Sequence, residues 1–425
     1  MNRPSIVEIT KPMQVKILDS YLSSKVQDFL GVKWNEIIVL YRDYEPVSSR
    51  AASCAIFTLI SDNYTIVKTS GGNAEELPFP VIYDQTSSSR TSPYSAVYFL
   101  TDKSGNKLTI RLKLSSAQFE QSFVQIYLPA RQIDLGRQFF NDLEKRLASL
   151  SDLRLNGAGD FLELAQPLTD EDLVLPAEIK QALKSNVIGF IEKYKESCKT
   201  HTNGEFNIIK RGVLLFGAPG TGKSLTIRWL MSVLRCNFII ATGKHLKRSD
   251  DVSEIFNLAR LIKPVVVVLE DLDLYGLSRD GGYFAGQILN ELLNQLDGSQ
   301  HNMSGIVTIG TANKTDVLDK ALTKRPGRFD VILHYKNPTF TERTNLLKLN
   351  LSKTKPDHSI DIAHIAGITD GFSPAQIVEV VKRAVILVSE QEGTAISQAD
   401  LISAVNQLKE PTKEIGFKRV KGQTE

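Results

Sequence analysis

Residues 217–224 have the sequence Gly217-Ala218-Pro219-Gly220-Thr221-Gly222-Lys223-Ser224. An apolar run, residues 213–216, precedes this stretch, and an apolar-periodic segment that begins at Leu225 follows it. The pattern predicts a strand, a glycine-rich loop and a helix. Glycines let the backbone curl so that successive N–H groups point at phosphate oxygens, and the helix adds its positive N-terminal end. Lys223 supplies a charge for the outer phosphates, and the Ser224 hydroxyl is placed to bind Mg2+. We therefore expect residues 217–225 to bind ATP together with Mg2+.

The composition is that of an ordinary soluble globular protein. The chain has 425 residues, of which 42% are hydrophobic and 23% charged, enough for two or three domains. A balance of 51 basic and 48 acidic residues gives a net charge of +3, so nucleic acid is not an expected partner. Cys54, Cys198 and Cys236 lack CxxC spacing, which fits reduced thiols and predicts no zinc site.

No membrane or secretion signal is expected. No uncharged apolar run approaches the ~18 residues that a spanning helix needs, and residues 1–13 lack the apolar core of a signal peptide. We expect a cytoplasmic protein without a membrane span.

The first part of the chain is predicted to be a β-rich α+β domain, residues 1–155. A helical period covers residues 14–29, and a second helix is expected at 135–150. The strand-like runs between them are residues 36–41, 54–60, 64–69, 96–101, 107–114 and 123–129. This region contains no catalytic constellation, and by analogy we expect it to bind a client protein.

After a connector at residues 156–176, the pattern changes to an α/β fold over residues 177–337. A helix is expected at 177–196, and strands and helices then alternate. The expected strands are residues 237–241, 265–269 and 305–310, and the expected helices are 251–261 and 285–296. Near-continuous apolar strands predict a parallel sheet that is covered on both faces. We expect the ligand of such a sheet to bind at the carboxyl ends of the strands.

The last part is predicted to be a small helical lid, residues 338–410, followed by a basic tail, residues 411–425. Helical periods cover residues 341–351, 362–366, 374–390 and 398–408.

Two of the predicted strands end in polar residues that suit ATP hydrolysis. Residues 265–269 lead into Glu270 and Asp271, and the strand at 305–310 is followed closely by Asn313. One carboxylate can hold the Mg2+ shell while its neighbour orients or deprotonates the attacking water. The asparagine amide can reach the γ-phosphate or the water. The alternative is a solvated acidic loop after a core strand.

With KRPGRFD at residues 324–330, the sequence resembles the AAA ATPase family. GAPGTGKS, the acidic strand end, TANKTDVLD and KRPGRFD follow one another in the family's order and cover roughly residues 165–410. The resemblance implies that Asn313 is the first sensor. It also implies that Arg325 and Arg328 reach the γ-phosphate of a neighbouring subunit, in a homo-oligomeric ring that is usually a hexamer.

The acidic pair departs from the family's order, which is Asp followed by Glu. Here Pro264 and Asp273 fix a register in which Glu270 precedes Asp271. We expect Glu270 to serve the Mg2+ shell and Asp271 the water. A register slipped by one, with Asp271 serving the metal, remains open.

A second departure lies at residues 244–251, Lys-His-Leu-Lys-Arg-Ser-Asp-Asp. Members of the family that unfold proteins carry a longer insert here, with an aromatic residue that grips an extended polypeptide in the axial channel. The short polar segment, together with residues 269–273 and 278–280, resembles most closely the mitochondrial AAA chaperones that assemble respiratory complex III. No membrane anchor is expected in this sequence.

These features predict an Mg2+-dependent AAA ATPase that acts as a chaperone or protein remodeller without ordinary threading. One alternative is a nucleic-acid-stimulated remodeller. The other is a protease-coupled unfoldase, although the sequence contains no HEXXH motif of a zinc protease.

Overall fold

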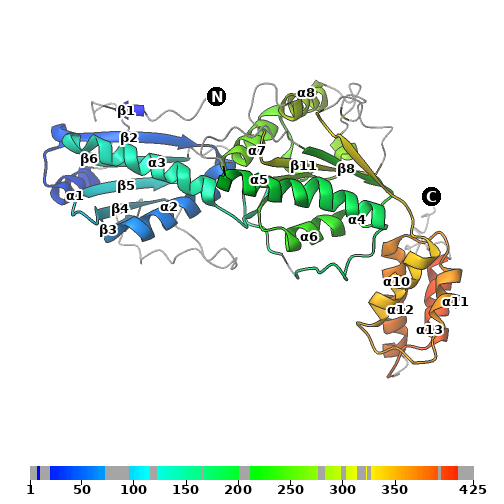
Figure 1. The fold of residues 1–425 in the computed structure, drawn as a ribbon. Helices are drawn as coiled ribbons and strands as arrows, with labels where there is room; N and C mark the ends of the chain where they lie inside the picture. The colour runs from blue at the N-terminus through cyan, green and yellow to red at the C-terminus, as the bar shows by residue number, and fades with distance from the viewer. Residues whose placement is uncertain are drawn as a thin grey trace, which may run out of the picture. The chain divides into compact units, whose positions relative to one another are not determined.

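The computed structural model describes residues 7–9, 20–71, 95–114, 122–164, 166–200, 211–275, 283–297, 303–313, 322, 327–390 and 394–409 (Figure 1). The chain divides into two compact units. The first comprises Met1–Pro167, Lys180–Phe216 and Ile227–Leu333, and the second comprises Leu168–Ile179, Gly217–Thr226 and His334–Glu425.

The first unit opens with an antiparallel sheet in the order β1-β2-β6-β5-β4-β3. Its strands are β1 (Val7–Ile9), β2 (Ile37–Tyr44), β3 (Tyr64–Gly71), β4 (Ser95–Asp102), β5 (Lys107–Lys113) and β6 (Ser122–Pro129). Its helices are α1 (Ser20–Leu30), α2 (Ser49–Asn63) and α3 (Ile133–Ser149). The predicted β-rich N-terminal region is confirmed.

One predicted strand of this region is wrong. Residues 54–60 lie inside helix α2 and not in a strand. Ten residues of α2 are buried, on most sides of the helix, so the segment has no polar face from which a helical period could be recognised. A short, continuous apolar run fits a buried helix and a buried strand equally well.

The two faces of the antiparallel sheet are covered differently. Helices α2 and α3 pack on one face, where Phe139 and Phe140 are fully buried. On the other face, α1 packs Leu22 and Val26 against strand residues such as Phe99.

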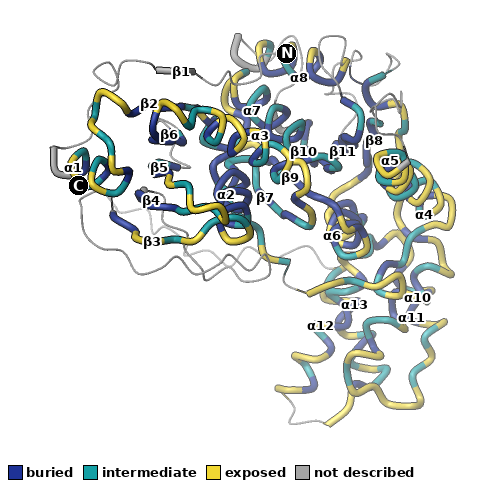
Figure 2. Tube along the Cα trace, turned by 60° about the vertical axis from the view of Figure 1, so that its left-hand side comes forward, coloured by how far each residue is buried: buried dark blue, intermediate teal, exposed yellow. Residues whose placement is uncertain are grey.

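The second sheet has the order β12-β8-β11-β10-β9-β7, and the pairs from β8 to β7 are parallel. Its strands are β7 (Arg154–Asn156), β8 (Arg211–Gly217), β9 (Asn237–Ala241), β10 (Val265–Leu269), β11 (Ile306–Ala312) and β12 (Val331–Tyr335). The strands β8 to β11 are largely buried (Figure 2). Because β8, β11 and β10 are parallel neighbours, their carboxyl ends lie at one edge of the sheet. The predicted α/β fold is confirmed.

The helices around this sheet alternate with its strands along the chain. They are α4 (Ala177–Leu183), a π-helical turn η5 (Lys184–Ile188), α5 (Gly189–Thr200), α6 (Lys223–Val233), α7 (Ser249–Leu261) and α8 (Tyr283–Asp297).

The two sheets of the first unit share one hydrophobic core. The core cluster runs from the antiparallel sheet through α2 and α3 to β9, β10, α7 and α8. Strand β7 follows the first region and pairs with β9 of the second sheet. Asn237 is fully buried between them, with Nδ2 donating to the Leu150 and Ile262 oxygens at 2.7 and 2.5 Å and Oδ1 accepting from Leu153 N at 2.9 Å. The N-terminal region is therefore packed tightly onto the α/β region.

The second unit contains four lid helices around a core of their own. They are α10 (Phe340–Leu351), α11 (Ile362–Ile368), α12 (Pro374–Glu390) and α13 (Gln398–Lys409). Across the parts of the chain that the structure describes, no helix has the length and apolar character to span a membrane.

Candidate functional site

The glycine-rich loop, residues 217–224, connects β8 to α6. Gly220 and Gly222 have φ angles of 78° and 104°, a left-handed region of the backbone that side chains disfavour. A Cβ atom on Gly222 would meet no heavy atom within 4 Å. The backbone at this turn therefore borders open space, as a loop that curls around phosphate oxygens requires.

Side chains of the loop turn back onto its own carbonyl groups. Lys223 is 7% exposed, and its Nζ donates to the oxygens of Gly217 and Ala218 at 2.5 and 3.0 Å. The Thr221 hydroxyl donates to Ala218 O at 2.7 Å. The ammonium group is thus held inside the loop, where it can bind phosphate oxygens. The next two residues of α6 are exposed: Ser224 and Leu225.

Two residues of the same unit that are distant in the sequence contact the loop and the start of α6. Ala375, in the first turn of α12, donates its N–H to Gly220 O at 3.1 Å, and a Cβ on Gly220 would lie 3.0 Å from the Ala375 Cβ. The Tyr335 hydroxyl donates to Thr226 Oγ1 at 3.0 Å. Burial raises the pKa of Tyr335, so the hydroxyl keeps the proton that it donates.

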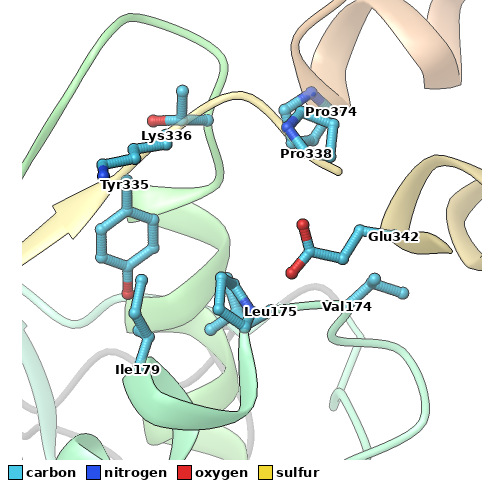
Figure 3. A pocket seen from close by; sticks show the side chains of 10 residues that line it. Val174, Leu175, Ile179, Tyr335, Lys336, Pro338, Glu342 and Pro374 are labelled. Atoms are coloured by element: carbon cyan, nitrogen blue, oxygen red, sulfur yellow. The ribbon is translucent and has the colours of Figure 1, made fainter. Parts of the chain in front are cut away.

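A small pocket, partly open to solvent, lies beside the loop in the second unit (Figure 3). Its apolar lining residues are Val174, Leu175, Pro176, Ile179, Pro338 and Pro374. Its other lining residues are Thr221, Tyr335, Lys336 and Glu342. Thr221 belongs to the glycine-rich loop, so the loop forms part of the wall of this pocket.

In the first unit, the structure brings Asp271 and Asn313 together. Asp271 has φ 54°, unusual for a residue other than glycine, and its N–H donates to Thr311 Oγ1 at 2.8 Å. Asn313 Nδ2 lies 3.5 Å from Asp271 Oδ1, and Asn313 N donates to Asp273 Oδ1 at 3.1 Å. A carboxylate and an amide therefore meet beyond the ends of β10 and β11.

Glu270 lies between β10 and this turn. Its N–H donates to Ala241 O at 2.9 Å, which continues the ladder between β9 and β10 by one residue. The side chains of Ser224, Glu270 and Asp271 offer hydroxyl and carboxylate oxygens, the ligands that Mg2+ prefers. Within the second unit, the Gly222 turn and the buried ammonium of Lys223 fit the phosphates of a nucleotide; within the first unit, the carboxylates of Glu270 and Asp271 suit Mg2+.

Arg328 has a carboxylate partner in its own chain. Its Nε and Nη2 donate to Asp297 Oδ1 and Oδ2 at 2.7 and 2.8 Å, and Arg328 is 4% exposed. Asp297 is the last residue of α8. Arg325 lies outside the described residues.

The sequence patterns did not indicate several residues near the predicted ones. They are Thr311, Asp297, Tyr335 and Glu342. The first three bond to residues distant in the sequence, and Glu342 lines a pocket formed by four separate stretches of the chain. Only Thr311 could have been found from the sequence, because it is a hydroxyl residue near the carboxyl end of a predicted strand.

The model of the AAA family, described as "ATPase family associated with various cellular activities", matches residues 213–337. The chain contains an AAA ATPase domain. This domain implies nucleotide binding and, with the relatives below, indicates ATP hydrolysis. The family resemblance is confirmed at this level, and the finer resemblance to complex III assembly chaperones stays a prediction.

The similar curated proteins are named as proteases. The chain is 32% identical over 305 residues to the ATP-dependent zinc metalloprotease FtsH of Mesomycoplasma conjunctivae, covering 68% of this chain and 39% of that protein. It is 28% identical over 294 residues to FtsH 2 of Salinibacter ruber, covering 67% and 42%. It is 34% identical over 209 residues to the YME1 homolog of Schistosoma mansoni, covering 47% and 31%. The chain thus spans less than half the length of each of these three relatives.

Proposed function

We propose that the protein is a ring-forming, Mg2+-dependent ATPase that remodels client proteins. Residues 217–225 bind the phosphates of ATP, with the ammonium of Lys223 on the outer phosphates. Ser224 and Glu270 hold Mg2+, which supplies positive charge to the phosphate oxygens. Residues 1–155 bind the client.

Asp271 orients the attacking water and accepts its proton. The amide of Asn313, 3.5 Å from the Asp271 carboxylate, fixes that carboxylate in position. Arg325 and Arg328 act on the ATP of the neighbouring subunit, and the pair between Arg328 and Asp297 has to open before Arg328 can do so.

The structure of residues 244–251 supports remodelling without threading. Burial, together with the charge of Lys244, lowers the pKa of His245, which keeps the ring neutral, and its Nδ1 accepts from Thr242 N at 3.0 Å. At the other end, Asp251 accepts the N–H groups of residues 247 and 248, each at 2.9 Å. Leu246 is buried. A segment fixed at both ends, with no aromatic side chain, lacks the grip that threading needs.

The names of the relatives favour a second candidate, an unfoldase that works with a protease. In this case the protease would be another chain or a segment beyond these 425 residues. A nucleic-acid-stimulated remodeller is the third candidate, and the near-neutral charge of the chain argues against it.

The proposal is tested by trapping the ATP-bound state. In the Asp271→Asn variant, ATP should bind but turn over slowly, so the protein should retain a client in ATP and release it in ADP. A pull-down followed by mass spectrometry measures which proteins are retained in ATP and in ADP, with the unaltered protein as the control. Recovery of nucleic acid alone would reverse the order of the candidates, and co-purification of a protease would favour the unfoldase.

A further inference from the structure

The turn that carries Asp271 is fastened to the end of β11 by a side chain. The backbone ladder between β10 and β11 ends at the pair of Leu269 with Gly310. One residue further along β11, the hydroxyl oxygen of Thr311 accepts the N–H of Asp271 at 2.8 Å. Thr311 is 2% exposed, so this bond is shielded from water. The hydroxyl thus links the two strands where the regular backbone pairing has stopped.

Two further contacts hold the same turn against β11. Leu272 is fully buried, and a Cβ atom on Gly310 would lie 2.7 Å from its Cδ1. In the opposite direction, Asn313 donates its N–H to Asp273 Oδ1 at 3.1 Å. The two residues that follow Asp271 are therefore fixed to β11 and to its carboxyl end.

The backbone of Asp271 has a conformation that depends on such support. Its φ angle of 54° lies in the left-handed region, which a residue with a side chain keeps only where its surroundings impose it. In this conformation the Oδ1 atom of Asp271 lies 3.5 Å from Asn313 Nδ2. Loss of the acceptor for the Asp271 N–H would let the turn relax and carry the carboxylate away from the amide. The Thr311 hydroxyl and the position of the carboxylate are thus coupled through one peptide N–H.

We propose that Thr311 is a positioning residue for ATP hydrolysis. Its hydroxyl acts through the backbone of Asp271 and keeps the carboxylate beside the amide of Asn313, where both face the attacking water. The proposal deepens the proposed function and rests on it, because it takes Asp271 as the residue that handles the water. Nucleotide binding does not depend on this bond, since the glycine-rich loop binds the phosphates.

The variant Thr311→Val has nearly the shape of threonine but offers no acceptor to the N–H. In the full-length protein it should lower the single-turnover rate of ATP hydrolysis by about 10- to 100-fold, since a small displacement of a reacting group has effects of that size. The affinity for ADP with Mg2+, measured by titration calorimetry, should change by less than about twofold. Thr311→Ser restores the hydroxyl and should recover most of the rate.

Thr308→Val is the matched control. Thr308 is as buried as Thr311 and lies earlier in β11, where it pairs with Val267 inside the ladder. The control removes a hydroxyl from the same strand without touching the turn, so it should keep the rate of the unaltered protein. A loss of rate in the control as large as in Thr311→Val would show general damage to β11 and would overturn the proposal.

A double-variant cycle separates a positioning role from a structural one. In the Asp271→Asn background, Thr311→Val should cause little further loss of rate, because the carboxylate that the hydroxyl positions is already gone. Losses that multiply would overturn the proposal, as would an unchanged rate in Thr311→Val or no recovery in Thr311→Ser. If Asp271→Asn alone hydrolyses ATP at the rate of the unaltered protein, the proposed role of Asp271 fails and the role of Thr311 with it, and the single variant shows this independently.

Discussion

Glu270 and Asp271 are adjacent carboxylates with different surroundings. The backbone of Glu270 extends the ladder between β9 and β10, whereas Asp271 lies in a left-handed turn beside the amide of Asn313. This difference favours Asp271 as the residue that handles water and Glu270 as the residue that serves the metal.

Exchanging each carboxylate for its amide separates the two roles. Asp271→Asn should lower ATP turnover by at least about 100-fold, because it removes a general base, while ATP binding is kept. Glu270→Gln should raise the Mg2+ concentration for half-maximal turnover about tenfold. Steady-state ATPase assays over a series of Mg2+ concentrations measure both effects. The opposite result, with the metal effect in Asp271→Asn, would establish the slipped register.

Among the elements, the junction of β7 and β9 depends on one buried amide. Asn237 bonds to Leu150, Leu153 and Ile262. Asn237→Leu should leave two carbonyls and one N–H unpaired and lower the free energy of unfolding by about 3 kcal/mol, as measured by urea denaturation. Asn350→Ala is a suitable control, since Asn350 bonds to a carbonyl of its own helix. Equal losses in the two variants would show that Asn237 has no special role at the junction.

Helix α7 carries a carboxyl group with an altered pKa. Burial, with the negative charges of Glu45 and Asp251 nearby, raises the pKa of Glu254 from 4.5 to about 7. The folded protein then binds more protons than the unfolded chain between these two pH values, so this group lowers stability as pH rises through 4.5 to 7.

Glu254→Gln should remove that part of the pH dependence and raise the melting temperature at pH 8 relative to the unaltered protein. At pH 4 the two proteins should melt alike, because Glu254 is protonated in both states. Scanning calorimetry at both pH values measures the difference, with the exposed Glu178→Gln as control. A difference that is the same at pH 4 and pH 8 would contradict the assignment.

The elements were predicted well where the signal is local. The glycine pattern, the apolar strands β9 and β10 and the lid helices all follow from neighbouring residues. Helix α2 was not predicted because its apolar surface is buried on most sides, and β7 is three residues long and formed by pairing with β9. At the site, the pairing of Arg328 with Asp297 depends on a contact 31 residues away in sequence, which no local pattern contains.

At the scale of the whole molecule, the proposed ring needs an arginine that acts between subunits. Arg325→Ala should lower turnover of the assembled protein by about 1,000-fold or more and leave the melting temperature unchanged. Arg328→Ala should lower both, because it leaves Asp297 without its bidentate partner. Measuring the ATP turnover and the melting temperature of each variant distinguishes the roles of the two arginines.

Mixed assemblies decide whether the arginine acts in trans. Adding excess Arg325→Ala chains to the unaltered protein should inhibit turnover beyond simple dilution. Turnover that falls in strict proportion to the fraction of unaltered chains would place the arginine's action within its own subunit.

In the proposed function, ATP hydrolysis drives the remodelling of a client protein. The most direct measurement is the ATP turnover of the full-length protein with an unfolded model protein, a folded model protein or DNA, with Lys223→Ala as the inactive reference. We predict Mg2+-dependent turnover that a protein raises and DNA leaves unchanged. Turnover raised by DNA alone, and lost steeply with added salt, would contradict the claim.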